Sequence, residues 1–131
     1  MILHLDLGSA SQVGLKVRKG ASEETVIGVR RDPAEVFVDR TRSGNTTFHE
    51  RFPGRHAAPL RPETKTVRLH VFVDWSSVEV FANDGEVVLS ERIFPSAESD
   101  GIEIFAEGGD AAVRSLQIWR IQSIWGEENA R

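Results

Sequence analysis

Apolar residues at every second position organise the centre of the chain. From Val67 to Val73 the odd positions are valine or leucine, and the even positions are arginine, histidine and phenylalanine. Since successive side chains of a strand point to opposite faces, this alternation predicts a strand with one face against a core. The alternation resumes at Val78 and Val80, and residues 86–94 return as a third strand. Turn-forming residues at 74–77 and 83–85 separate these segments, so the region predicts a β-meander.

Short alternating segments also flank the meander. They lie at residues 2–7, 13–17, 25–29, 35–39, 102–105 and 112–121. Turn residues separate them, including Gly8–Gln12, Arg31-Asp32-Pro33 and Gly108-Gly109-Asp110. No stretch keeps a helical period of about 3.6 residues. Short strands with turns between them predict an all-β sandwich.

Two segments depart from this regular pattern. Residues 41–66 are polar and broken by glycine and proline, so we expect a long loop, with Phe48 and Phe52 pinning it to the sandwich. In residues 116–121 both faces are apolar, with Trp119 opposite Ile118. Such a strand is either covered by another segment or exposed as a patch. We expect the chain's own tail, with Ile124 and Trp125, to cover it, and a docking surface is the alternative.

Composition excludes several classes of function. At 131 residues, with 40% hydrophobic content, the chain is expected to form one globular domain over residues 1–131. The net charge of −4 argues against nucleic acid, which needs a cationic face. The absence of cysteine excludes disulfides and cysteine-ligated metals. No apolar run approaches the roughly 20 residues that cross a bilayer, so no membrane partner is expected.

The N-terminus indicates a segment of a longer protein. Residues 1–7 lack the basic start of a signal peptide and alternate as a strand already under way. We therefore expect the chain to be the end of a larger polypeptide, with no signal peptide of its own.

A long motif carries a resemblance to a known family. FVDWSSVEVFANDGE at 72–86, followed by RIFP at 92–95, resembles the C-terminal domain of glycoside hydrolase family 32, the invertases, levanases and inulinases. GLKVRKG at 14–20, FVDRTRSG at 37–44 and SLQIWRIQSIW at 115–125 fit the same domain in the same order. The resemblance implies an antiparallel β-sandwich of the jelly-roll, concanavalin-like kind. It also implies a catalytic propeller as the partner domain, absent from this chain, and secretion as part of a bacterial parent enzyme.

The resemblance does not extend to catalytic residues. The family's catalytic domain uses N-D-P-N-G, Arg-Asp-Pro and Glu-Cys motifs. Arg31-Asp32-Pro33 spells the second and Asn83-Asp84-Gly85 partly echoes the first. Both lie at expected hairpin turns, where these residue types serve the backbone, and the third motif needs a cysteine. We expect no catalytic residue and no cofactor. The histidines lack ligand spacing, so no metal is expected either.

Sugar binding is the better-supported chemistry. Carboxylates and guanidinium groups bind sugar hydroxyls, and an aromatic ring packs on the sugar's apolar face. The resemblance adds that some relatives of this domain are levan-binding modules that grip a terminal fructose. The expected ligand is therefore β-fructan, either levan or inulin, or fructose itself. The candidate ligand-binding residues flank a strand end and the first meander turn, and they are Asp39, Arg40, Arg42, Asp74, Trp75 and Glu79.

The alternative gives the same side chains a structural role. Arg40 and Arg42 would then pair with Asp39, Asp74 or Glu79 to neutralise partly buried charges. In that case the domain stabilises the propeller or mediates formation of a homodimer, without binding sugar.

Overall fold

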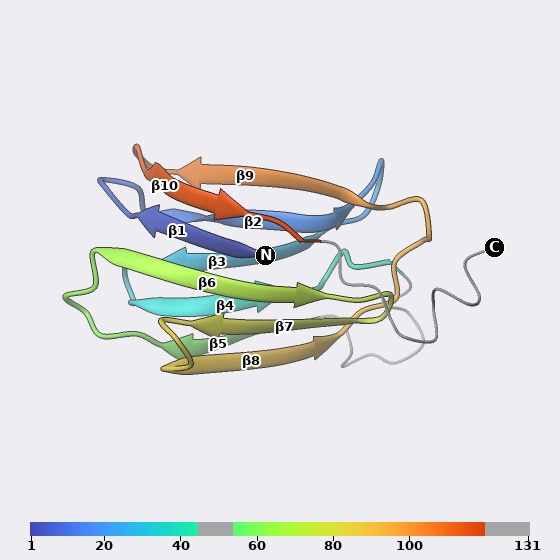
Figure 1. The fold of residues 1–131 in the computed structure, drawn as a ribbon, viewed down its shortest axis with the longest axis horizontal. Coiled ribbons are helices and arrows are strands. Elements are labelled where there is room, and N and C mark those ends of the chain that lie inside the picture. The colour runs from blue at the N-terminus through green and yellow to red at the C-terminus, as the bar shows by residue number, and fades with distance from the viewer. Residues whose placement is uncertain (45–53, 120–131) are drawn as a thin grey trace.

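Antiparallel strands in two layers make up the fold (Figure 1). The structure is a computed structural model, and it describes residues 1–44 and 54–119. The strands are β1 (Ile2–Asp6), β2 (Gln12–Lys19), β3 (Thr25–Arg30), β4 (Glu35–Asp39), β5 (Arg55–Pro59), β6 (Thr66–Val73), β7 (Ser77–Ala82), β8 (Val87–Arg92), β9 (Gly101–Glu107) and β10 (Ala112–Gln117).

Each layer is a five-stranded sheet. The meander sheet has the order β10-β1-β6-β7-β8, and the second sheet has the order β5-β4-β3-β2-β9. The predicted β-meander is confirmed, because β6, β7 and β8 are antiparallel neighbours. The all-β sandwich predicted from the alternation is confirmed as well.

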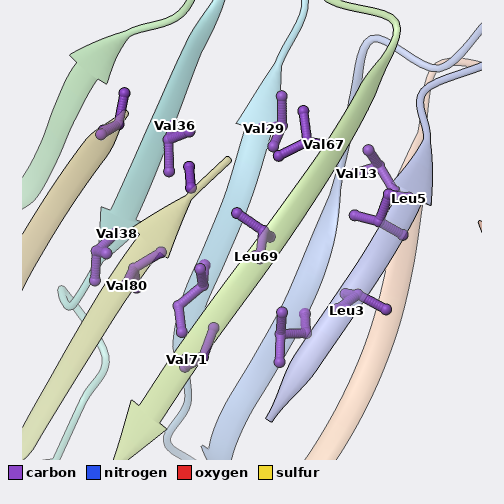
Figure 2. Packing of buried hydrophobic residues seen from close by; sticks show 14 of the residues in the cluster. Leu3, Leu5, Val13, Val29, Val36, Val38, Val67, Leu69, Val71 and Val80 are labelled. Atoms are coloured by element: carbon purple, nitrogen blue, oxygen red, sulfur yellow. The ribbon is translucent and has the colours of Figure 1, made fainter. Parts of the chain in front are cut away.

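The core lies between the two inner faces. In the meander sheet Leu3 pairs with Leu69 and Leu5 pairs with Val67, and all four side chains are fully buried. The second sheet contributes the alternating apolar residues of β2, β3 and β4, which include Val13, Val29, Val36 and Val38 (Figure 2). The predicted apolar faces of these strands therefore meet one another, as a sandwich requires.

The prediction of one long loop over residues 41–66 was wrong for residues 55–59. Residues 55–59 form β5, which pairs with β4 at the edge of the second sheet. This strand lacks large apolar side chains and ends in Pro59, a residue that sheets tolerate at their edges. Composition alone therefore indicated a loop. Phe48 and Phe52 lie outside the described residues.

Along one edge of the sandwich, several apolar side chains are exposed. Ile104 pairs with the buried Leu15, and Leu116 pairs with the buried Leu3, so both point inward, yet each is 37% exposed. Beyond β10, Ile118 and Trp119 are each 53% exposed. Among the described residues the apolar patch is thus exposed rather than covered. The tail residues Ile124 and Trp125 lie outside the described part of the chain.

We predict that Val71→Ala and Val80→Ala each lower the free energy of unfolding by about 1–3 kcal/mol, through lost burial and a cavity. Both side chains face the core and are at most 1% exposed. Val88→Ala is the control, because Val88 lies on the outer face of β8 and is 50% exposed. Urea denaturation measures all three. Equal loss at Val88 and Val71 would contradict the observed register.

Candidate functional site

Loops from both sheets gather at the end of the sandwich where β2, β4, β6 and β8 finish, which we call the loop end (Figure 1). Backbone hydrogen bonds join these loops. The Glu24 amide donates to the Arg42 carbonyl at 2.8 Å, and the Phe94 amide donates to the Ser43 carbonyl at 3.2 Å. The Ile93 amide donates to the Ser76 carbonyl at 3.0 Å. The loop end is therefore an ordered surface on which side chains can hold fixed positions.

Arg18 joins loops of the two sheets at this end. Its guanidinium donates to the carbonyls of Ser99 at 2.7 Å, Ser96 at 2.9 Å, Trp75 at 3.0 Å and Asp74 at 3.2 Å. The residue is 9% exposed. A buried arginine needs its donors satisfied, and here backbone carbonyls satisfy them without a carboxylate partner in direct contact.

Glu23 holds the β8–β9 loop from the other side. Its Oε1 accepts hydrogen bonds from the Ser99 hydroxyl at 2.6 Å and from the Ser96 amide at 2.7 Å. The Ser99 hydrogen bond is the main cause that lowers the pKa of Glu23. Partial burial acts in the opposite direction and raises this pKa, and the hydrogen bond from the Ser96 amide lowers it further.

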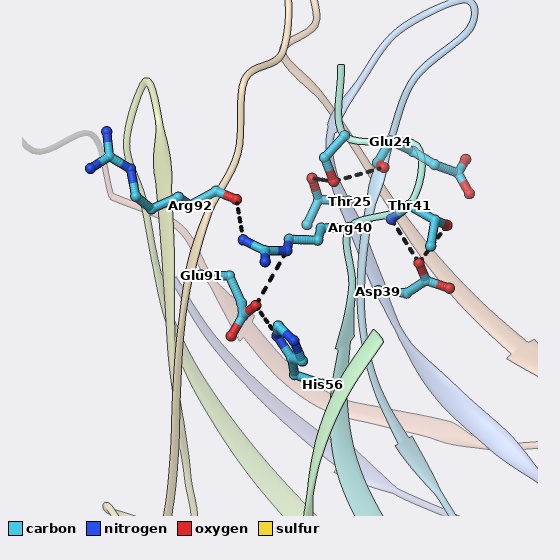
Figure 3. A network of polar contacts seen from close by, with 9 residues as sticks. Glu24, Thr25, Asp39, Arg40, Thr41, His56, Glu91 and Arg92 are labelled. Atoms are coloured by element: carbon cyan, nitrogen blue, oxygen red, sulfur yellow. Dashed lines mark hydrogen bonds and ion pairs between the residues drawn. The ribbon is translucent and has the colours of Figure 1, made fainter. Parts of the chain in front are cut away.

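Asp39 and Arg42 border a small cavity. The Asp39 carboxylate accepts from the Thr41 amide at 2.9 Å and the Thr41 hydroxyl at 2.7 Å, which fixes the turn after β4 (Figure 3). Glu24, Val26 and these three residues line a cavity of about 60 Å³. Drug-sized ligands occupy pockets of about 300–1,000 Å³, so this cavity suits a hydroxyl group and not a whole sugar ring.

Arg40 points elsewhere, into contact with β8. Its Nε lies 3.6 Å from the Glu91 carboxylate, and its Nη1 donates to the Arg92 carbonyl at 3.1 Å. His56 of β5 also contacts the Glu91 carboxylate (Figure 3). The Arg40 and Glu91 side chains are 13% and 8% exposed. Arg40 thus contacts Glu91, a carboxylate that the ion-pair alternative did not name.

The remaining candidates separate into two places. Asp74 accepts from the Trp75 amide at 2.7 Å in the β6–β7 turn, and Trp75 is 69% exposed over Arg18. Glu79 is exposed on the outer face of β7, opposite Phe72 and Ser90. The structure thus brings Asp39 and Arg42 together at the loop end and places Asp74 and Trp75 in another of its loops. The Arg40 side chain points toward β8 instead, and Glu79 lies on the outer face of β7.

Sequence reasoning missed Arg18, Glu23 and Glu24. Arg18 lies inside the GLKVRKG motif, but no pattern in the sequence shows that it bends into the loop end. The sequence could have added Thr41 to the candidate residues, since it lies between Arg40 and Arg42 at the same strand end.

Comparison with known proteins identifies the family. A model described as "Glycosyl hydrolases family 32 C terminal" matches residues 1–120. The chain belongs to this family. It is 45% identical to a levanase of Bacillus sp. (strain L7) over 95% of this chain and 14% of that protein. It is 46% identical to a levanase of Bacillus subtilis (strain 168) over 91% of this chain and 18% of that protein.

Solved family 32 enzymes share the fold. Exo-inulinase from Aspergillus awamori superposes with a TM-score of 0.75 at 34% identity, over 84% of this chain and 23% of that one. The chain thus spans less than a quarter of these relatives, and it corresponds to their C-terminal domain.

The motifs that echo family 32 catalytic signatures lie at turns. Arg31-Asp32-Pro33 is in the β3–β4 turn of the second sheet, and Asn83-Asp84-Gly85 is in the β7–β8 turn of the meander sheet. Asn83, Asp84 and Gly85 have φ values of 50°, 59° and 94°. Asparagine, aspartate and glycine are the residues that best tolerate this left-handed region, as the turn prediction required.

Within residues 1–44 and 54–119, no group of three or more histidine, aspartate or glutamate side chains could hold a metal ion. The same residues contain no helix that is long and apolar enough to cross a membrane.

Acid should weaken the Glu23 contacts. Because folding lowers the pKa of Glu23 from its ordinary value of 4.5, the folded state favours the carboxylate, and the resulting stability is fully present above pH 4.5. It is lost as the pH falls through the lowered value. We expect Glu23→Gln to flatten the acid side of the melting temperature–pH profile. Glu98→Gln, at an exposed position of the β8–β9 loop, is the control. An unchanged acid slope in Glu23→Gln would contradict this assignment.

Proposed function

We propose that this chain is the non-catalytic accessory domain of a secreted family 32 glycoside hydrolase, and that it binds β-fructan at the loop end through a terminal fructose. The observation that carries the proposal is that two exposed side chains, Trp75 and Arg42, lie in loops at this same end of the sandwich. Arg42 belongs to the turn after β4 that the Asp39 carboxylate fixes. The names of the relatives, levanase and extracellular exo-inulinase, support fructan as the ligand and secretion as the destination.

The side chains supply complementary interactions. Arg42 is exposed, with one donor 3.5 Å from the Ser22 carbonyl, and its remaining N–H groups can donate to sugar oxygens. A carboxylate has about four acceptor positions, so Asp39 can accept from a fructose hydroxyl while it holds Thr41. The cavity between them admits a hydroxyl group, and the Trp75 ring offers an apolar surface for C–H groups of the sugar.

The turn positions of the two aspartates support a non-catalytic role. Retaining glycoside hydrolysis needs two carboxyl groups about 5–5.5 Å apart across the scissile bond. Asp32 and Asp84 lie in turns of different sheets and serve the backbone there. The catalytic domain of the parent enzyme would supply the hydrolysis.

We therefore expect the purified chain to release no fructose from sucrose, levan or inulin above the buffer rate. A reducing-sugar assay measures the release. Turnover that Asp32→Ala or Asp84→Ala abolishes would contradict the non-catalytic assignment.

A second candidate function rests on the outer face of the meander sheet. His70, Phe72 and Phe81 form an aromatic cluster there, with ring centroids 4.5 Å apart for His70–Phe72 and 5.9 Å apart for Phe72–Phe81. Phe72 and Val88 are 38% and 50% exposed. An exposed apolar patch favours contact with another protein surface. In this function the domain stabilises the catalytic domain of its parent enzyme without binding sugar.

Sugar binding at the loop end predicts that Arg42→Ala and Trp75→Ala each weaken levan or inulin binding at least tenfold. For Arg42, a hydrogen bond to a charged group contributes about 1.5–3 kcal/mol, which corresponds to that loss. For Trp75, the loss comes from the apolar ring surface that the sugar can no longer cover. Isothermal titration measures the affinity, and a thermal melt should be unchanged because both residues are exposed. Trp119→Ala is the matched control, at an exposed tryptophan beyond β10.

Glu79→Gln separates the two surfaces. Full affinity in this variant is expected if fructan binds at the loop end. Loss of affinity there, with Arg42→Ala unaffected, would move the ligand to the outer face of the meander sheet. A parent chain that binds neither levan nor inulin would leave the structural function as the better account.

A further inference from the structure

We propose that Arg18 is a positioning residue that holds Trp75 as a rigid platform on which a sugar ring stacks. This inference rests on the proposed fructan binding at the loop end. In this role the buried Arg18 does not contact the ligand itself. It keeps the solvent-exposed Trp75 ring in a fixed position.

The backbone conformation at Arg18 directs its side chain toward the loop end. The register of β2 against β9 shifts between Lys16 and Lys19, which marks a β-bulge. Within it Arg18 has a φ of 45°, in the left-handed region that non-glycine residues seldom adopt. Bulges redirect a side chain, and strained residues persist where surrounding contacts hold them. Here the redirected guanidinium leaves the second sheet and reaches the β6–β7 turn of the meander sheet.

The hydrogen bonds of Arg18 fix two loops at once. Its donors reach the carbonyls of Asp74 and Trp75 in the β6–β7 turn, and those of Ser96 and Ser99 in the β8–β9 loop. Only a planar guanidinium offers five donors in a fixed geometry, whereas a lysine offers three donors on one atom. Lysine at this position would therefore keep the charge and lose most of the bridge.

Trp75 is anchored on one side and open on the other. The guanidinium carbon of Arg18 lies 5.3 Å from the centroid of the Trp75 ring, within cation–π distance. The Asp74 carboxylate caps the Trp75 amide at 2.7 Å, yet the residue stays 69% exposed. A ring that is already immobilised loses little conformational entropy when a ligand packs on it. This arrangement favours stacking of a sugar ring on the open side.

The β8–β9 loop has a second anchor, which makes the test feasible. Glu23 holds the Ser96 amide and the Ser99 hydroxyl through hydrogen bonds that do not use the Arg18 guanidinium, although the positive charge of Arg18 also helps to lower the pKa of Glu23. Loss of the Arg18 bridge should therefore release Trp75 more than it disturbs the rest of the loop end.

The experiment uses fluorescence of Trp75 alone. The chain has three tryptophans, so Trp119→Phe and Trp125→Phe leave Trp75 as the sole emitter. In this background we expect the anisotropy of Trp75 to decay with the tumbling of the whole protein. Arg18→Lys should add a fast local component and weaken levan or inulin affinity at least tenfold. Arg18→Gly should do the same, although glycine relieves the backbone strain at this φ.

Val71→Ala is the control for a purely structural effect. It should lower stability while it leaves both the anisotropy of Trp75 and the fructan affinity unchanged at temperatures well below the melt. Unchanged anisotropy in Arg18→Lys, or altered anisotropy with full affinity, would overturn the proposal. If the parent chain binds neither levan nor inulin, the proposed function fails and the sugar platform fails with it. The anisotropy then still reports whether Arg18 holds the ring.

Discussion

The mutual burial of two apolar sheet faces is the constraint on which the structure depends. Neither sheet can remove its own leucine and valine rows from water, and full burial of one such side chain contributes about 1.5–3 kcal/mol. Leu5, Leu15 and Ile27 illustrate the result, since each is completely buried between the sheets. Because the inner faces are committed to one another, recognition chemistry is left to the outer faces, the edges and the loops at the ends.

Sequence periodicity could predict the parts of the fold that this constraint governs. Alternation located the meander and the apolar sides of β1, β2 and β6, since burial of one face imposes a period of two on the sequence. It could not predict β5, an edge strand that lacks large apolar side chains and buries little. Nor could it predict the exposure of Ile104, which points inward at an edge that no described segment covers. Local pattern specifies the direction of a side chain but not what lies opposite it.

The arginines of the loop end show why the candidate site was harder to predict. Arg18, Arg40 and Arg42 have the same chemistry, but backbone carbonyls surround the first and Glu91 faces the second. The third is exposed. The first two environments come from residues distant in sequence, brought together by a bulge in β2 and by the approach of β8 to β4. The motif FVDRTRSG indicates a strand end rich in charge, and tertiary contacts decide which charge remains available to a ligand.

The two candidate functions place different demands on desolvation, and the two surfaces differ accordingly. Burial of Phe72 and Val88 against an apolar protein surface is favourable, because these groups give up no hydrogen bonds with water. Burial of Arg42 and Asp39 in the same way would leave charges unpaired, which costs free energy unless the partner supplies donors and acceptors. A polyhydroxylated chain supplies both at every residue, whereas an apolar protein surface does not. The loop end therefore suits a fructan, and the outer face of the meander sheet suits a protein partner. The two candidate functions therefore depend on different side chains of the same domain.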